Sequence, residues 1–457
     1  MKIRKGHVRL GAGSAEPADR IEPVIELAEK GDVDYLCFDS LSETELINCV
    51  NYKISNPDKG YDMYTERRLR SIMSICARNR IRIIGNMGGA NPNAAQDLAI
   101  KIARELGLKG MKIAAVTGDD VLQIVKKLNL EVKETDKRVN EFRDKLIAAH
   151  AYIPVIPLVE ALQEGADIVI AGRVADASLF LAPLMYEFGW KEDDWDYLAK
   201  GIIIGHLMEC GGQLSGGYFP DPPYKEVPDL YRLGFPIAEV SANGDTIITK
   251  VPGSGGLVSP ATCAEQMLYE VGDPCNYIEA DVIADFQDIG FEQVGKDRVA
   301  ITGLIKGKPR PETLKVELVI REGYAAESVV FYAGPGAYER AKLAADTMRK
   351  RLELITKIQA TELRFDFIGM GAIYAQPPEV PECVPWEVGV RGAVRTEERW
   401  EAWKLLHEFQ TIDNNGPAGI ARGLRAAGGE DVREILGYYW TLIPRDKVRT
   451  KVLMKEA

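Results

Sequence analysis

The chain has 457 residues, of which 46% are apolar, so it exceeds what one hydrophobic core usually serves and can fill two or three. Lysine and arginine number 57 against 68 aspartates and glutamates, which gives a net charge of -11 with no basic block to offset it. We therefore expect no nucleic acid among its partners.

The cysteines and the apolar runs indicate where the protein works. Seven cysteines are scattered without a C-x-x-C pair, which favours free thiols in a reducing compartment over a disulfide framework or a zinc site. The basic N-terminus reaches glycine before any apolar run, and no segment approaches the ~18 apolar residues of a membrane span. We expect a soluble cytoplasmic protein that does not bind membranes.

Residues 1–220 predict a Rossmann-like α/β domain with a doubly wound, largely parallel sheet. Short apolar runs alternate there with helical patterns, as βα units require. Three segments, 22–31, 65–79 and 93–107, repeat apolar residues at helical spacing and predict helices packed on the sheet. The expected strands are Val8–Leu10, Tyr35–Phe38, Ile81–Gly85, Met111–Val116, His150–Ile153 and Ile168–Ala171.

Two proline-rich stretches, 218–236 and 374–387, predict breaks between domains. Residues 221–375 are expected to form an α+β domain whose sheet has one helical face, and 376–457 a small C-terminal α+β unit with a Trp-rich helix at 397–409 and a short helix. The expected strands of the middle domain are 245–251, 297–307, 313–323 and 328–334, with helices near 260–271 and 336–356.

Four predicted strand-to-helix turns, 10–17, 86–95, 251–262 and 332–339, are rich in glycine. Converging backbone N–H groups and a helix N-terminus could hold a phosphate or carboxylate there, but such turns also serve only to fold a helix onto a sheet. The candidate anion- or substrate-binding residues are Gly11, Gly13, Ser14, Gly88, Gly89, Asn91, Gly253, Ser254, Gly255 and Gly256.

The first turn shares part of the dinucleotide-binding fingerprint. Asp39 ends the second expected strand, where such folds place a ribose-binding acid. Glu16 and Pro17, however, replace the third glycine and bring a negative charge to the position of the pyrophosphate. The sequence therefore favours a small anion or substrate over a nicotinamide cofactor.

Arg173 and Asp176 follow a buried strand abruptly, at the sheet edge where open α/β folds collect ligands. The arginine could hold a substrate carboxylate or phosphate while the aspartate transfers a proton. Alternatively, the two form an ion pair that caps the next helix. The sequence leaves both interpretations open.

In "GHLMECGGQLSGGYF" (205–219), His206, Glu209 and Cys210 lie at i, i+3 and i+4 of a helical pattern, and therefore on one face. They could form an acid/base pair or a His-activated thiol, and we predict no metal because no second ligand cluster lies nearby. Cys210 is more simply a small buried hydrophobe, and His206 is equally well explained as a core residue. Glu209, a carboxylate ending an apolar helix, needs a partner or a role.

Weaker candidates are His150, before an expected strand, and the residues of a strong turn signal in the C-terminal unit. Those turn residues are His407, Asp413, Asn414 and Asn415.

Five motifs in order resemble the acyclic terpene utilisation (AtuA-like) family over nearly the whole chain. They are "GAGSAEPADRIEPVIELAEKGDVDYLCFDSLSE", "NMGGANP", "IAGRVADASLFLAPL", "GHLMECGGQLSGGYF" and "KVPGSGGLVSPATCAEQMLYEVGDP". Longer family members add a ferredoxin-like domain at the C-terminus, so the resemblance implies a short form with a small ferredoxin-like partner protein. It also implies a catabolic role beside acyl-CoA enzymes of terpenoid breakdown.

We expect an enzyme that acts on a small carboxylate or its CoA thioester by acid/base chemistry, as a hydratase, dehydratase or lyase. Glu209 and Asp176 would move protons, and Arg173 would hold a carboxylate, in a site between the first two domains. No cofactor is predicted, CoA enters only as part of the substrate, and we expect a homo-oligomer. Two alternatives stay open: a hydrolase or acyltransferase with Cys210 as nucleophile and His206 as base, and a non-catalytic subunit that binds a small partner protein.

Overall fold

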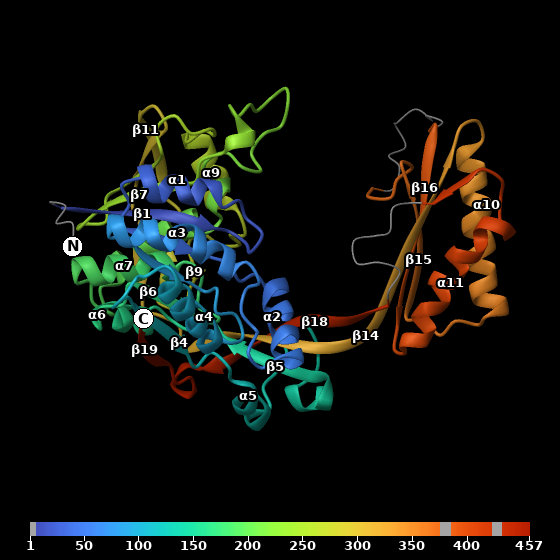
Figure 1. Cartoon of the computed structure of the whole chain (residues 1–457), viewed down its shortest axis with the longest axis horizontal. Helices are drawn as coiled ribbons and strands as arrows, with labels where there is room; N and C mark the ends of the chain where they lie inside the picture. Colours follow the sequence, from blue (N-terminus) through green and yellow to red (C-terminus); the bar gives the residue numbers. More distant parts are fainter. Residues whose placement is uncertain (1–5, 375–384, 423–431) are drawn as a thin grey trace. The chain divides into compact units, whose positions relative to one another are not determined.

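The computed structural model describes residues 6–374, 385–422 and 432–457. The chain divides into two compact units, Met1–Leu318 with Tyr438–Ala457, and Val319–Gly437 (Figure 1). This division differs from the three consecutive segments expected from the sequence, because the last residues of the chain return to the first unit. The expected break at 374–387 and the short helix near the C-terminus fall largely outside the described residues.

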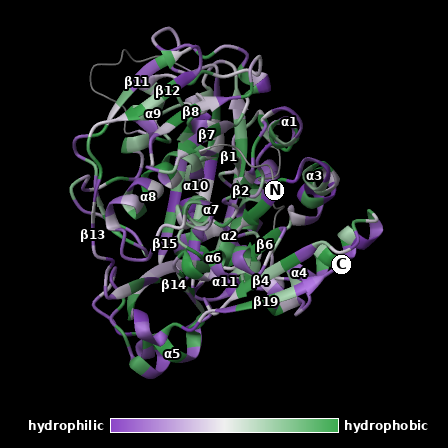
Figure 2. Ribbon diagram, turned by 90° about the vertical axis from the view of Figure 1, so that its left-hand side faces the viewer, coloured by the Kyte–Doolittle hydropathy of each residue, from purple (hydrophilic) through white to green (hydrophobic). Residues whose placement is uncertain are grey.

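The first unit is built on a ten-stranded sheet in the order β11-β12-β8-β7-β1-β2-β3-β6-β4-β19. Its central strands are parallel, as predicted, and β2 has the expected bounds. They are β1 (His7–Ser14), β2 (Tyr35–Phe38), β3 (Arg82–Gly85), β6 (Ile168–Ala171) and β4 (Lys112–Thr117). Figure 2 shows hydrophobic residues along these central strands, which fits strands that are buried on both faces.

The sheet as a whole is mixed, so the expectation of a largely parallel sheet holds only for its centre. Antiparallel strands extend both edges, and the middle segment's first strands belong here rather than to a separate sheet. The alternation of apolar and polar residues in these strands predicts which face of each strand is buried. It does not predict which sheet the strand joins. The added strands are β7 (Pro236–Ser241), β8 (Thr246–Lys250), β12 (Arg298–Thr302), β11 (Gly290–Gly295) and β19 (Lys451–Glu456).

Helices cover both faces of the sheet, as a doubly wound arrangement requires. On one face α1 (Glu22–Lys30), α3 (Thr65–Asn79) and α4 (Pro92–Glu105) bury apolar stripes in one core. On the other, α6 (Ile156–Gln163), α7 (Ser178–Phe188) and α8 (Trp195–Glu209) form a second core. The remaining helices of this unit are α2 (Glu43–Ser55), α5 (Leu122–Leu128) and α9 (Pro260–Leu268).

Some strands of the first unit lie outside the ten-stranded sheet. The strand expected at His150–Ile153 is β5 (Leu146–Ala151), and it pairs with β14 instead of entering the parallel sheet. A separate three-stranded sheet has the order β13-β10-β9, from Lys306–Lys308, Ile283–Asp285 and Tyr277–Ile278.

The second unit has the order β14, α10, β15, β16, α11, β17 along the chain. Its sheet order, β15-β16-β14-β17, is antiparallel throughout, which is the βαββαβ arrangement of ferredoxin-like folds. The two helices pack in one core with this sheet. The bounds are α10 (Ala337–Lys350) with a π-helical turn at Arg351–Ile355, β15 (Glu362–Ile368), β16 (Glu387–Thr396), α11 (Arg399–Asn415), β17 (Ile420–Arg422) and β18 (Arg433–Pro444), which also pairs with β14.

Strand β14 (Thr313–Ala333) is continuous, whereas the sequence predicted two strands with a turn between them. The misleading signal was Gly323. It has a φ of +114°, and a Cβ there would lie 2.2 Å from the carbonyl oxygen of Thr396. The glycine therefore permits close approach of the neighbouring strand rather than a chain reversal.

Two glycines of α8 provide a matched test of how closely α8 packs on the segment that leads into α7. A Cβ at Gly205 would lie 2.5 Å from the backbone oxygen of Ala177, whereas one at Gly201 would meet side chains, the movable tip of Leu181 and, at 3.3 Å, the ring of Trp190. We expect Gly205→Ala to lower the free energy of unfolding by about 2 kcal/mol. In Gly201→Ala the better helix propensity of alanine, worth about 1 kcal/mol, should offset most of the strain.

Chemical denaturation of the two variants beside the unmodified protein measures this difference. Equal effects of the two substitutions would contradict the backbone contact at Gly205.

Candidate functional site

A cleft of about 640 Å³ opens where the parallel strands β1, β2 and β6 end at their carboxyl side. Loops collect at this edge in open α/β sheets, and ligands bind there. Five residues singled out in the sequence line it together: Asp39, Arg173, Asp176, Glu209 and Cys210. The other lining residues are Ala15, Glu16, Asp19, Arg20, Leu41, Ser42, Glu43, Gly212, Gln213, Gly217, Tyr218, Leu230, Leu233, Phe235, Tyr269 and Glu270, so the cleft lies within the first unit.

Arg173 is buried at the base of this edge, with 1% of its surface exposed. Its guanidinium donates to the carbonyl oxygens of Leu41 and Val174, pairs with Asp176, and lies 4.3 Å above the ring of Tyr152. Four of its five N–H donors are therefore engaged within the protein. The ion pair that the sequence left open is present, and the expected grip on a substrate carboxylate is not supported, because the donors are already used.

Asp39 is half-buried beside the cleft and held from two sides. Its Oδ1 accepts a hydrogen bond of 2.6 Å from Asn86, and the Ser14 hydroxyl donates to its backbone oxygen at 2.8 Å. Burial, joined by the charge of Glu209, raises the pKa of Asp39 to about 7, although Arg173 acts against the rise. A carboxyl that titrates near neutral pH can both donate and accept a proton at working pH.

Glu209 ends α8 and lines the cleft. Its hydrogen-bond partner His206 does not line the cleft. His206 Nδ1 lies 2.9 Å from Glu209 Oε1, and the Tyr277 hydroxyl lies 3.3 Å from the same nitrogen. Burial alone would lower the pKa of His206, but the bond to Glu209 and its charge raise it above the ordinary value. His206 therefore orients Glu209 from behind and leaves the other carboxylate oxygen unengaged by the histidine.

Cys210 lines the cleft next to Glu209. Burial first, and then the charge of Glu209, raise the pKa of the Cys210 thiol well above its usual value. The nucleophile of an acyl transfer is the thiolate, so these surroundings oppose the role of Cys210 in the alternative interpretation.

The glycines of the predicted anion turns are explained by close packing, since none of them lines the cleft. A Cβ at Gly13 would lie 2.5 Å from the ring of Phe38, and one at Gly88 would lie 2.5 Å from the carbonyl oxygen of Ala171. Similar contacts or a positive φ account for Gly11, Gly89, Gly253, Gly255 and Gly256.

The polar residues of these turns and the weaker candidates also have structural partners. Asn91 caps α4 and donates to the carbonyl oxygens of Pro57 and Lys59. The Ser254 hydroxyl donates to the carbonyl oxygen of Val251 at 2.7 Å. In the second unit the rings of His407 and Trp403 stack at 4.9 Å, and Asp413, Asn414 and Asn415 end α11.

The sequence analysis missed Asp119, which fixes the loop that carries Arg173. Its Oδ2 accepts a hydrogen bond of 3.1 Å from the backbone N–H of Arg173 and lies 2.7 Å from His150 Nδ1. A Cβ at Gly172 would lie 2.6 Å from this carboxylate, so the glycine makes room for it. Asp119 follows β4 just as Arg173 follows β6, and that same strand-end signal could have found it.

A further missed group is Glu317 on β14, which is 0% exposed and lies within the electrostatic reach of Arg173. Among the described residues neither of its carboxylate oxygens has a hydrogen-bond partner. Burial raises the pKa of Glu317 to about 7, with Arg173 acting against the rise. One arginine therefore influences two carboxyls, Asp39 and Glu317, that titrate near neutral pH.

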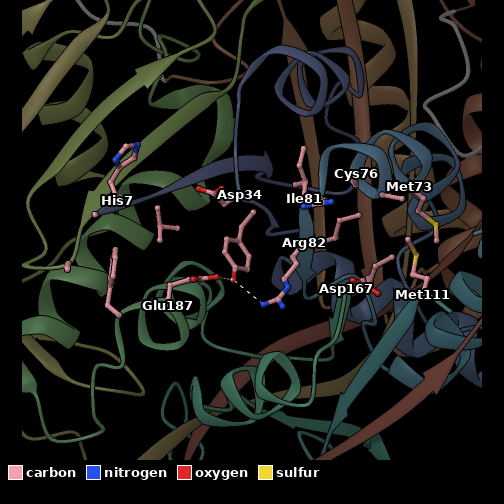
Figure 3. A pocket seen from close by; sticks show the side chains of 18 residues that line it. His7, Asp34, Met73, Cys76, Ile81, Arg82, Met111, Asp167 and Glu187 are labelled. Atoms are coloured by element: carbon pink, nitrogen blue, oxygen red, sulfur yellow. Dashed lines mark hydrogen bonds between the residues drawn. The ribbon is translucent and has the colours of Figure 1, made fainter. Parts of the chain in front are cut away.

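Figure 3 shows a second cavity, of about 460 Å³, at the amino ends of the same strands. The Tyr35 hydroxyl there donates to Glu187 at 2.5 Å and accepts from Arg82 at 3.3 Å. Asp167, also on its wall, accepts a hydrogen bond from the backbone N–H of Lys112. Since these polar groups are engaged and this edge is opposite the ligand-binding one, we assign the functional site to the cleft.

Among the described residues, no group of three or more His, Cys, Asp or Glu side chains is placed to hold a metal ion. Among the same residues, no helix combines the length and apolar character needed to cross a bilayer.

The fold and the cleft define a mixed α/β protein with a carboxylate-rich site at the carboxyl ends of its parallel strands. The chain belongs to the acyclic terpene utilisation family: the model of the acyclic terpene utilisation family protein AtuA matches residues 8–454. No curated protein and no solved structure matches the chain. The family match confirms the resemblance that the five sequence motifs carry.

Glu317 gives a stability prediction whose sign follows from its pKa. Since folding raises that pKa from 4.5 to about 7, ionisation opposes folding, and the penalty grows between these pH values to about 3 kcal/mol. Glu317→Gln should therefore stabilise the protein at pH 8 relative to pH 5. Urea denaturation at both pH values measures this, with the exposed Glu312→Gln as control. A Glu317→Gln effect that is equal at both pH values would contradict a buried titrating carboxyl.

Proposed function

We propose that the protein is a catabolic enzyme of acyclic terpene utilisation that acts by general acid/base chemistry on an acyl-CoA thioester or small carboxylate, as a hydratase, dehydratase or other lyase. The observation that carries this proposal is that Asp39, with a pKa of about 7, and Glu209 line one cleft. Paired carboxyls with different surroundings can divide the roles of acid and base. The family supports the metabolic setting.

In the dehydration direction, Glu209, oriented by His206, takes the proton from the carbon beside the acyl carbonyl. Protonated Asp39 gives its proton to the departing hydroxyl, so water leaves as the carbon–carbon double bond forms. Hydration is the same path in reverse, with each carboxyl exchanging its role. Asp176, which was expected to move protons, is held against Arg173 and serves in this proposal to position that arginine.

We further propose a cytoplasmic enzyme in which CoA enters only as part of the substrate. Glu16 lines the cleft beside the loop after β1, where a dinucleotide fold would hold a pyrophosphate. Its charge supports the absence of a nicotinamide cofactor from the proposed reaction.

Asp39→Asn and Glu209→Gln test the two roles. Each substitution keeps the shape of the side chain but removes its proton transfer, so kcat/KM for a panel of branched 3-hydroxyacyl and enoyl thioesters should fall by about 100-fold or more. Glu16→Gln, which removes a carboxylate from the same cleft without a role in the mechanism, is the control and should change kcat/KM by less than about threefold. Unchanged turnover in both test variants would rule out the assignment.

The pH profile of the same experiment separates catalysis from binding. Asp39 must carry its proton to act as the acid, so kcat/KM for dehydration should decline as the pH rises through about 7. The residual activity of Asp39→Asn should lack this decline.

Cys210→Ser tests the thiol alternative. Because the thiol stays protonated beside Glu209, we expect this variant to retain turnover within about threefold, as should Cys275→Ser at a half-exposed cysteine away from the cleft. Alkylation of Cys210 by iodoacetamide at pH 7.5, followed by peptide mass spectrometry, should be slower than that of a free thiol. A loss of activity above 100-fold together with rapid labelling would instead support a cysteine nucleophile.

A further inference from the structure

The cleft carries a large excess of negative charge. Seven carboxylates line it: Glu16, Asp19, Asp39, Glu43, Asp176, Glu209 and Glu270. Two arginines, Arg20 and Arg173, line the same walls. This balance is unexpected for a site that would bind a free carboxylate, because like charges brought together oppose binding.

The two arginines offset that excess only in part, because Arg20 uses one of its nitrogens, Nη1, within the protein and Arg173 uses all three. Arg20 donates to the carbonyl oxygens of Leu230 and Tyr231 at 3.1 and 3.3 Å, at the outer edge of the cleft. Arg173 is occupied by Asp176 and by backbone carbonyls. An anionic ligand would therefore meet seven carboxylates with only the exposed guanidinium of Arg20, whose Nη1 is already bonded, to bind it.

The carboxylates are close enough to act on one another. Burial, followed by the charges of Glu209 and Glu43, raises the pKa of Glu270. Glu209 has the same effect on Asp39. Glu43 begins α2 and Glu270 follows α9, so helices far apart in sequence bring repelling groups to one opening.

Apolar side chains also form part of the wall. Leu41, Leu233 and Phe235 are 1%, 9% and 3% exposed and line the cleft. Tyr218 and Tyr269, with 87% and 36% exposure, stand at its rim. Buried apolar side chains of this kind accept a hydrocarbon chain, which gives the cleft an affinity that does not depend on charge.

We propose that the cleft takes the hydrocarbon acyl group as an uncharged ester or thioester and excludes the free carboxylic acid, with Glu43 and Glu270 as the residues that set this preference. The inference deepens the proposed function, on which it rests for the identity of the site. The preference also implies an order of reactions: a reaction that converts the free acid into a thioester must come before the reaction of this protein.

Equilibrium binding tests the preference without requiring turnover. The probes are one branched ten-carbon acyl chain presented as the N-acetylcysteamine thioester, as the methyl ester and as the free acid, titrated into the full chain at pH 8 by calorimetry. We expect both uncharged forms to bind at least tenfold more tightly than the acid. Binding by the thioester but not the methyl ester would still support the proposal and would identify the sulfur ester as the ligand.

Glu43→Gln and Glu270→Gln should lower the ratio of the thioester and acid affinities, because each removes one repelling charge. Glu29→Gln, an exposed carboxylate on α1 outside the cleft, should leave the ratio unchanged. Higher salt should also raise the affinity of the acid, since exposed charges are screened. Circular dichroism of each variant confirms that a changed ratio does not reflect unfolding.

Equal or tighter binding of the acid, failure of every probe to bind, or an unchanged ratio in both test variants would overturn the proposal. These outcomes differ from a failure of the proposed catalysis, which would appear as undiminished turnover in Asp39→Asn and Glu209→Gln. The proposed selectivity can therefore hold even if the catalytic residues have been assigned wrongly. The catalytic assignment can likewise hold even if the proposed selectivity is wrong.

Discussion

The buried guanidinium of Arg173 is the interaction on which the cleft depends. It joins the loop after β2, through the carbonyl oxygen of Leu41, to its own loop after β6, through Val174 and Asp176. Burying a cation is costly unless its donors are satisfied, and here the backbone, a carboxylate and the face of Tyr152 satisfy it. Removing the arginine would leave these acceptors without their donor and would remove the positive charge that most lowers the pKa values of Asp39 and Glu317.

Asp119 and Gly172 lie behind Arg173 and hold its backbone in place. The Asp119 carboxylate holds the backbone at Arg173, and the glycine provides the space for it to do so. The backbone position of Arg173 is thus fixed by Asp119, independently of the contacts that its side chain makes. Groups held this way keep their geometry without a ligand, which is how a site can be ready before the substrate binds.

The sequence was informative where a physical signal is local. Apolar periodicity found α1, α3, α4 and the central strands, and abrupt charges after buried strands found Arg173 and Asp176. It was uninformative about partners far along the chain, such as β19 beside β4, since alternation does not name a neighbour. The glycines were overinterpreted for the same reason: a residue without Cβ permits a close approach, and only the structure shows that Phe38 or Ala171, rather than a phosphate, makes it.

Charge also separates what the sequence could predict about the site from what it could not. The strand-end rule located Asp39, and helical spacing located Glu209. The total charge of the cleft also depends on Glu43, which begins α2, and Glu270, which follows α9, and these two share no motif. Their presence changes the meaning of the site, because carboxylates that would repel an anion also keep a neighbouring carboxyl protonated. Part of the charge that opposes a free acid, that of Glu209, also acts with burial to bring the pKa of Asp39 to about 7. Substrate preference and proton transfer would then share Glu209 as one electrostatic cause in this cleft.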